Sequence, residues 1–319
     1  KERKNLKEEE DMREIFVNLK RFDVPKDLGG VCNVDNPKAW IEEIVDKSVE
    51  LGLGTLEDMM VVYMLPEAYI IPAIDRLKRY PDERIRTLGI GVQGVYRTDV
   101  EKDGNFGALT THLPAAAAAN IGCKGVIIGH CEERRDKQEI IEAFESNITR
   151  NEVLREKLAN AVDSLINKEV LAALKRNMHV LLCIGETAQQ RGLGSLEEVK
   201  PNVEKVLKGQ LERGLVGVKD YLDSTNIVIA YEPIWAIGPG KIPPDSDYIA
   251  FVSSYIKKVT REILGKELAV VYGGGLKEEN AKMISEIETI DGGLVALTKF
   301  TGDIGFSVED LRVIIDKYN

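Results

Sequence analysis

The sequence lacks several features that mark other classes of protein. No apolar run approaches the length of a transmembrane helix. Lys and Arg number 43 against 53 Asp and Glu, and the formal charge of −10 argues against a general nucleic-acid or acidic-membrane binder. The charged start KERKNLKEEEDMREIF contains no signal-peptide core. We therefore expect a cytoplasmic protein that binds neither nucleic acid nor membranes.

Motifs for metals, disulfides and dinucleotides are also missing. The four cysteines form no CxxC pair and show no metal-ligand spacing, at Cys32, Cys123, Cys131 and Cys183. No GxGxxG follows the first apolar run, which weakens the case for a dinucleotide-binding domain. We expect reduced thiols, no bound metal and no cofactor.

Eight short apolar runs are present instead. Most are rich in Val and Ile, do not alternate with polar residues, and are bounded by polar residues or glycine, as parallel strands buried on both faces should be. The runs cover residues 15–20, 59–65, 88–94, 125–130, 179–185, 227–232, 268–274 and 293–297. Each of them is predicted to be a strand.

Segments with helical periodicity lie between these runs. Residues 37–52 and 244–265 each carry an apolar stripe at helical spacing, and Asp245 or Ser246 is a candidate N-cap of the second. Residues 136–178 form an unusually long connection, which predicts two helices or one helix with an insertion. Strands therefore alternate with helices along the chain.

Regular strand–helix alternation predicts a parallel sheet, and eight such units are the number that closes a (β/α)₈ barrel with outer helices. We expect a single barrel domain over residues 15–319, preceded by a polar extension over residues 1–14. An open, doubly wound sheet is the alternative, because periodicity alone does not separate the two folds.

Unusual side chains stand at the ends of the predicted strands. In an α/β barrel the chemistry belongs at the carboxyl ends of the strands, where this chain has Asn18, Lys20, His130, Glu232 and the glycines 273–275. Singly, each has an ordinary structural explanation, such as a rim lysine or a core histidine. Together, a carboxylate, an imidazole and a cation suit proton transfer next to a carbonyl group, and glycine-rich turns suit a phosphate.

These residues also carry a resemblance to a known family. The chain is similar to triosephosphate isomerases in order and spacing over residues 16–318, and the lid motif is the most specific match. The similar stretches are NLK (18–20), GVIIGHCEERR (125–135), CIGE (183–186), AYEPIWAIGPGK (230–241) and VYGGGLKEENAK (271–282). The family reads N-W-K, G-H-S-E-R-R, C-I-G-E, A-Y-E-P-V-W-A-I-G-T-G-K and Y-G-G-S-V-x-x-x-N at these places.

The resemblance implies roles for particular residues. Glu232 would be the base that moves a proton between two carbons, His130 the neutral electrophile, and Lys20 the cation that offsets the enediolate charge. Supporting roles would fall to Asn18, to Cys131 and to Glu132, which would pair with Lys20. A lid over residues 233–241 would close on the substrate. Its phosphate would meet backbone N–H groups of the remaining site residues, Gly238, Gly274, Gly275, Ala296 and Leu297.

Several positions depart from the family pattern. Cys131 replaces a serine, Glu133 is an extra acid before Arg134, and Leu19 and Gly275 replace a tryptophan and a serine. The family's L-V-G-G after the last strand is LVAL here, over residues 294–297. Extra length follows the first strand and separates the fourth strand from the fifth. These changes point to a reshaped phosphate end of the pocket with the catalytic trio retained.

Three functions remain open from the sequence. The first is interconversion of glyceraldehyde 3-phosphate and dihydroxyacetone phosphate, in glycolysis and gluconeogenesis. The second is the same chemistry on another ketose phosphate, such as erythrulose phosphate, and the third is a non-catalytic binding barrel. The small phosphorylated sugar is the expected partner. A homodimer is also expected, because the loop over residues 96–114, where the family makes its dimer contact, is present.

Overall fold

The computed structural model describes residues 12–32, 35–148, 151–222, 227–238 and 240–319. Its eight strands are hydrogen-bonded in chain order as a closed barrel, with β1 beside both β2 and β8. The predicted (β/α)₈ fold is confirmed, and the open-sheet alternative is wrong. The strands are β1 (Arg13–Asn18), β2 (Met59–Leu65), β3 (Leu88–Val92), β4 (Gly125–Ile128), β5 (His179–Ile184), β6 (Ile227–Tyr231), β7 (Ala269–Tyr272) and β8 (Gly292–Val295).

The chain divides into two compact units. One comprises the residues up to Gln93 together with Ile121–Gly125 and Val271–Asn319, and the other comprises Gly94–Asn120 and Val126–Val270. The predicted extension over residues 1–14 lies largely outside the described residues, and β1 already begins at Arg13. One barrel domain over residues 15–319 stays a prediction.

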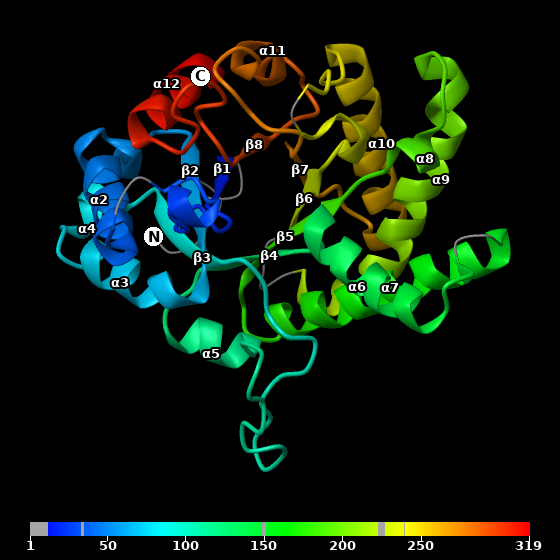
Figure 1. Ribbon diagram of the computed structural model, residues 1–319, viewed down its shortest axis with the longest axis horizontal. Helices are drawn as coiled ribbons and strands as arrows, with labels where there is room; N and C mark the ends of the chain where they lie inside the picture. Colours follow the sequence, from blue (N-terminus) through cyan, green and yellow to red (C-terminus); the bar gives the residue numbers. More distant parts are fainter. Residues whose placement is uncertain (1–11, 33–34, 149–150, 223–226, 239) are drawn as a thin grey trace. The chain divides into compact units, whose positions relative to one another are not determined.

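In the first unit, helices pack around parallel strands of known register. Ile15 of β1 pairs with Val61 of β2 and with Gly293 of β8. Helices α2 and α3 pack together, and α3 contacts β3 (blue to cyan in Figure 1). The helices are α2 (Pro37–Glu50), α3 (Glu67–Leu77), α4 (Asp82–Ile85), α11 (Ala281–Ser285) and α12 (Val308–Tyr318), with short 3-10 turns η1 (Lys26–Leu28) and η2 (Leu53–Thr55).

The second unit holds the long connection between β4 and β5. The prediction of two helices there is confirmed by α6 (Cys131–Phe144) and α7 (Glu152–Leu174). Helix α7 packs on α6, on α9 and on β5 (green in Figure 1). The other helices are α5 (Ala115–Asn120), α8 (Ala188–Arg191), α9 (Leu196–Gly214) and α10 (Ser246–Leu264), with 3-10 turns η4 (Val218–Tyr221) and η5 (Ile234–Ala236).

Burial explains why the strands read as continuous apolar runs. Every residue of β2 except Met60 is buried, as is every residue of β5 except His179 and every residue of β6. Side chains on both faces of these strands leave water, which is the main favourable term in folding. Each helix in the described part of the chain is too short or too polar to span a bilayer.

Candidate active site

The carboxyl end of β4 places His130 at the start of a helix. Gly129 follows β4 with φ +75°, and a Cβ on it would lie 2.9 Å from the carbonyl oxygen of Cys183, so only glycine fits this turn. His130 is then the N-cap of α6, and its ring nitrogen Nδ1 accepts a hydrogen bond from the N–H of Glu132 at 3.3 Å. The backbone thus fixes one edge of the imidazole.

Glu232 follows β6 directly and lies against His130. Its N–H donates to the carbonyl of Ile184 at 2.8 Å, which extends the pairing of β6 with β5 to this residue. The residue is only 1% exposed. Its Oε1 lies 3.2 Å from His130 Nε2, and its Oε2 accepts from the N–H of Cys131 at 2.9 Å. The structure therefore brings together the predicted base and the predicted electrophile.

The hydrogen bonds assign the protons of this pair. A backbone N–H can only donate, so Nδ1 of His130 must carry the lone pair that accepts from Glu132. The proton of a neutral imidazole then sits on Nε2, where it faces the Glu232 carboxylate. The start of α6 disfavours an additional positive charge on the ring. A neutral imidazole with Nε2–H as donor is the form that this site supports.

Three side chains at this place could also approach a metal ion together. His130, Cys131 and Glu232 offer ligand atoms that all lie within 4.8 Å of one another. A cation there would compete with the proton on Nε2 and would face the N–H groups at the beginning of α6, which favour an anion or a neutral acceptor. The arrangement suits proton transfer better than metal ligation.

The supporting residues after His130 lie in the first turn of α6. Cys131 Sγ is 3.8 Å from His130 Nδ1, so the thiol borders the imidazole. The Glu132 carboxylate lies 3.7 Å from the same nitrogen and is about half exposed. Its predicted pairing with Lys20 stays a prediction, because Lys20 belongs to the other unit.

In the first unit, Lys20 stands two residues beyond the end of β1, which is at Asn18 and not at Lys20 as predicted. Lys20 has φ +41°, an unfavourable value for a side-chain-bearing residue that often marks a functional position. Asn18 Oδ1 accepts the N–H of Lys20 at 3.0 Å, and Gln93 Nε2 donates to the Lys20 carbonyl at 2.9 Å. These contacts hold the lysine backbone in its strained form.

Four predicted phosphate-binding positions lie at the ends of β7 and β8 in the first unit. Among the described residues, none accepts a hydrogen bond from the N–H of Gly274, Gly275, Ala296 or Leu297. The side chain of Asn280 holds the first loop by donating to the Gly275 carbonyl at 3.1 Å. Leu297 does not take a positive φ, so the chain accommodates it without left-handed backbone. The four N–H groups are placed outside the secondary-structure pairing.

The segment after Leu297 folds back on itself. Gly305 accepts the N–H groups of Thr298 and Lys299 at 3.0 and 3.1 Å, and its own N–H donates to the Lys299 carbonyl at 3.2 Å. These two N–H groups are therefore engaged within the protein, unlike those of Ala296 and Leu297. The backbone N–H groups of Thr298 and Lys299 are therefore not available to a phosphate in this form.

The predicted lid begins with a 3-10 turn, η5, directly after Glu232 and Pro233. The indole of Trp235 in this turn donates to Glu186 Oε1 at 2.8 Å. Gly238 has φ +119°, and a side chain there would meet nothing within 4 Å. Residue 239 of the lid lies outside the described residues.

Glu186 connects the lid to the barrel. Two further donors reach its Oε1 at 2.8 Å, the hydroxyls of Tyr231 and Tyr248. Burial raises the pKa of Glu186 despite these three hydrogen bonds, each of which favours the carboxylate. Arg191 also lies over the Trp235 ring, 4.5 Å from its centroid. The amino-terminal part of the lid is thereby anchored to the loop after β5.

Sequence reasoning missed Gln93, Glu186 and the contacts of Glu133. A signal existed for Gln93, since a polar side chain directly after an apolar run marks the carboxyl end of a strand. Glu186 was noticed as part of CIGE, but nothing in the sequence names its three donors. Such side-chain contacts depend on the assembled fold.

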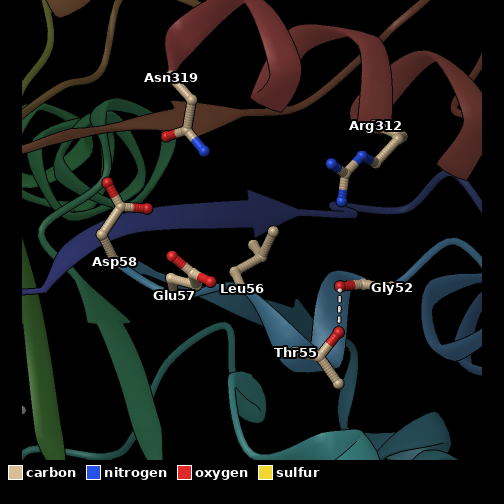
Figure 2. Close-up of a pocket in the computed structure, with 7 residues that line it drawn as sticks. All are labelled: Gly52, Thr55, Leu56, Glu57, Asp58, Arg312 and Asn319. Carbon is tan, nitrogen blue, oxygen red and sulfur yellow. Dashed lines mark hydrogen bonds between the residues drawn. The ribbon is translucent and has the colours of Figure 1, made fainter.

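A separate polar cavity of about 580 Å³ lies in the first unit, beside the residues that precede β2. Figure 2 shows Glu57 and Asp58 on one side of it and Arg312 and Asn319 on the other; Gly52, Thr55 and Leu56 complete the lining. Leu56, Glu57 and Asp58 stand at the amino end of β2, whereas barrel enzymes place their chemistry at the carboxyl ends. The cavity is not the catalytic pocket.

Comparison with known proteins decides the family. The family model described as triosephosphate isomerase matches residues 57–303, most of the chain. The chain belongs to the triosephosphate isomerase family. The matched residues include His130 and Glu232, whereas Asn18 and Lys20 precede them. Membership makes the chain an isomerase that acts on sugar phosphates by intramolecular oxidation and reduction.

Individual relatives agree with the family match. A triosephosphate isomerase of Chloroherpeton thalassium is 34% identical over 214 residues, which cover 66% of this chain and 70% of that protein. Those of Rhodopirellula baltica and Lawsonia intracellularis are 29% identical over 272 residues and 31% identical over 259 residues. These matches cover 84% and 80% of this chain, and 88% and 85% of the respective relatives.

Proposed function

We propose that this member of the triosephosphate isomerase family interconverts glyceraldehyde 3-phosphate and dihydroxyacetone phosphate. The observation that carries the proposal is the buried Glu232 carboxylate, 3.2 Å from the Nε2 of a neutral His130. A base and a neutral N–H donor side by side are what proton transfer between adjacent carbons requires. The relatives bear the name of this reaction.

The reaction follows from that geometry. Glu232 removes a proton from the carbon next to the substrate carbonyl, and the electron pair of the broken C–H bond forms an enediolate. Nε2–H of His130 hydrogen-bonds the oxygen on which negative charge grows. Glu232 then returns the proton to the neighbouring carbon, and His130 passes the hydroxyl proton from one substrate oxygen to the other through Nε2, so that no external oxidant is needed. The resemblance assigns Lys20 to offset the charge of the enediolate.

The phosphate end of the proposed site uses backbone groups. The N–H groups of Gly274, Gly275, Ala296 and Leu297 have no protein acceptor among the described residues. Such clustered N–H groups bind anions without a dedicated cation. Gly238 in the lid is assigned one more such contact by the resemblance. Closure of the lid would exclude water from the reacting atoms.

A second candidate is the same chemistry on a tetrulose phosphate. Two observations favour it: Ala296 and Leu297 replace the glycine pair of the family, and Thr298 and Lys299 are tied into a turn by Gly305. Both alter the walls around the phosphate. The nearly unchanged lid motif favours the triose phosphates, which we keep as the first candidate.

A substrate panel tests the proposal. Purified protein would be given glyceraldehyde 3-phosphate, dihydroxyacetone phosphate and erythrulose phosphate, with proton exchange followed by NMR. We expect turnover of the triose phosphates and, for Glu232→Gln, a loss on the order of 10²- to 10⁴-fold. Glu139→Gln, an exposed change on α6, is the matched control.

Each outcome of the panel decides between the candidates. A kcat/KM that is tenfold higher for erythrulose phosphate would replace the first candidate with the second. No turnover of any sugar phosphate would leave only the non-catalytic barrel.

We propose further that the protein is a cytoplasmic homodimer. All four cysteines lie in the described residues as thiols, which fits a reducing compartment. The loop after β3 exposes Phe106, 87% accessible, in the region where the family makes its dimer contact. Light scattering coupled to size exclusion tests the dimer, and a mass of one chain at micromolar concentration would contradict it.

A further inference from the structure

The residue before His130 is held through both of its backbone polar groups. The N–H of Gly129 donates to Glu133 Oε2 at 2.6 Å, and its carbonyl accepts from Arg134 Nε at 2.8 Å. Because the orientation of this residue sets the direction in which the next one leaves the strand, these contacts determine where His130 lies. The side chains of Glu133 and Arg134, in the first turn of α6, thus hold the backbone at the end of β4 in place.

Other residues of the second unit hold the Arg134 side chain in place. Nη1 of Arg134 donates to Asp163 on α7 at 2.6 Å, and Asp163 also accepts from Arg213 on α9 at 2.8 Å. The same guanidinium donates to the carbonyl of Cys183 in β5 at 3.1 Å. Arg134 is one of the paired arginines that the family motif contains, so this anchor fits the general pattern.

The Glu133 contact is anchored independently. Lys137, one turn later on α6, lies 2.5 Å from Glu133 Oε1 and 3.0 Å from Glu169 Oε1 on α7. Glu169 is 3% exposed. Burial and the interaction with Glu133 raise the pKa of Glu169 to about 9, which favours the protonated form of Glu169 at neutral pH.

Glu133 itself is the ionised member of this group. Burial acts to raise its pKa, but the hydrogen bonds from Glu169, Lys137 and the Gly129 N–H, with the charge of Lys137, lower it overall. One carboxylate and one ammonium remain, and their charges cancel. Glu133 is therefore a fixed acceptor for the Gly129 N–H, which would otherwise lose its partner in a buried turn.

We propose that Glu133 is a positioning residue for His130, which it aligns with Glu232 by fixing the Gly129 peptide against α7. The inference rests on the proposed function for its catalytic consequence. Glu133 is the extra acid in the GHCEERR motif. In this chain Glu133 is therefore a second side chain that holds the Gly129 backbone, in addition to Arg134.

Substitutions of Glu133 test this role through kinetics. Glu133→Gln keeps an oxygen that can accept from Gly129 but loses the charge that binds Lys137, whereas Glu133→Ala loses both. We expect kcat to fall about 10-fold for glutamine and on the order of 10²-fold for alanine, because small displacements of a reacting group have effects of this size. KM should stay within about twofold. Glu139→Ala, on the same helix in an exposed pair with Arg135, should change neither.

A measurement without substrate separates positioning from turnover. The chain has three histidines, so the imidazole Nε2–H signal of His130 can be assigned in ¹⁵N-histidine protein by comparison with His112→Gln and His179→Gln. We expect this signal to shift or broaden in Glu133→Ala and to stay in place in Glu139→Ala.

The outcomes distinguish the two proposals. If the wild type turns over no sugar phosphate but the His130 signal moves in Glu133→Ala, the proposed function fails and the positioning role stands. If the wild type is active and both kcat and the His130 signal are unchanged in Glu133→Ala, the positioning role is refuted. If circular dichroism shows that the alanine variant does not fold, Glu133→Gln decides by the same two readouts.

Discussion

Replacing Glu186 with alanine removes the acceptor shared by three donors around the lid. Tyr231 and Tyr248 are buried, and Trp235 lies at the beginning of the lid itself. All three donate to Glu186 Oε1 at 2.8 Å. The alanine variant leaves two buried hydroxyls without this partner and releases the indole that holds η5 in place.

The size of the effect can be worked from these contacts. A buried donor left unsatisfied costs about 1–3 kcal/mol. The half-buried Trp235 can turn toward water, and removal of the carboxylate ends the desolvation that raises the pKa of Glu186. We therefore expect a net loss of about 2–4 kcal/mol in the free energy of unfolding. With an unfolding entropy of roughly 0.7 kcal/mol/K for a chain of this length, Tm should fall by about 3–6 °C.

Glu186→Gln separates the hydrogen bonds from the charge. Its amide oxygen can accept the same three donors, so at pH 7 its Tm should lie well above that of the alanine variant. The folded-state pKa of Glu186 is raised, so the stability it contributes is present below about 4.5 and is lost as pH rises through the folded value. The Tm of the glutamine variant relative to wild type should therefore improve from pH 5 to pH 8.

Thermal unfolding followed by circular dichroism measures both effects, and Trp235 fluorescence, recorded in a Trp40→Phe background, reports release of the lid. Glu139→Ala, whose side chain pairs only at the surface in its 3.9 Å contact with Arg135, is the control. The reasoning is refuted if Glu186→Ala melts within about 1 °C of wild type, or if the alanine and glutamine variants melt together at pH 7.

Three further predictions concern the same regions. Burial raises the pKa of Glu169 to about 9, so the stability that this group contributes is present below about 4.5 and is lost as pH rises toward 9. The free energy of unfolding of Glu169→Gln, measured by urea titration, should therefore gain on that of wild type by up to about 1.4 kcal/mol per pH unit. A difference that stays constant with pH would contradict this. Gly129→Ala should lose about 2–4 kcal/mol, from left-handed strain and from contact with the Cys183 carbonyl at 2.9 Å, and wild-type stability would show that the turn adapts. Asn280→Ala should raise KM about tenfold with kcat little changed, because Asn280 holds the Gly275 carbonyl and accepts the N–H of Lys277; a fall in kcat alone would place its role elsewhere.

Much of the fold follows from local signals along the chain. The strand over residues 59–65 has the predicted limits, because its apolar run ends at a proline. Asp245 caps α10 as expected, accepting the N–H of Tyr248, since capping depends on neighbours in the chain. The end of β1 was misplaced because Leu19 is apolar and buried, and its N–H still donates to the Met64 carbonyl of β2, although the strand ends at Asn18.

The site was only partly readable from the sequence. His130 and Glu232 were found because strand ends and family motifs point to them, and the structure brings them together. The roles of Gln93 and Glu133 were not found, because each acts through a contact between a side chain and a backbone group whose position depends on the fold. Helix α6 begins at Cys131, earlier than the periodic segment suggested. Because Glu133 lies in the first turn of this helix, its carboxylate reaches back to Gly129.

The cysteine beside His130 makes the neighbourhood of the His130–Glu232 pair accessible to thiol-directed reagents. Cys32, Cys123 and Cys183 are buried, and burial raises the pKa of Cys123 to about 12, so these thiols react slowly. Cys131 is partly exposed and lies 3.8 Å from the imidazole. An alkylating reagent applied to the folded protein would therefore label Cys131. The labelled fraction would measure the proportion of molecules in which this site is folded and accessible. A family member with serine at this position has no thiol there to label.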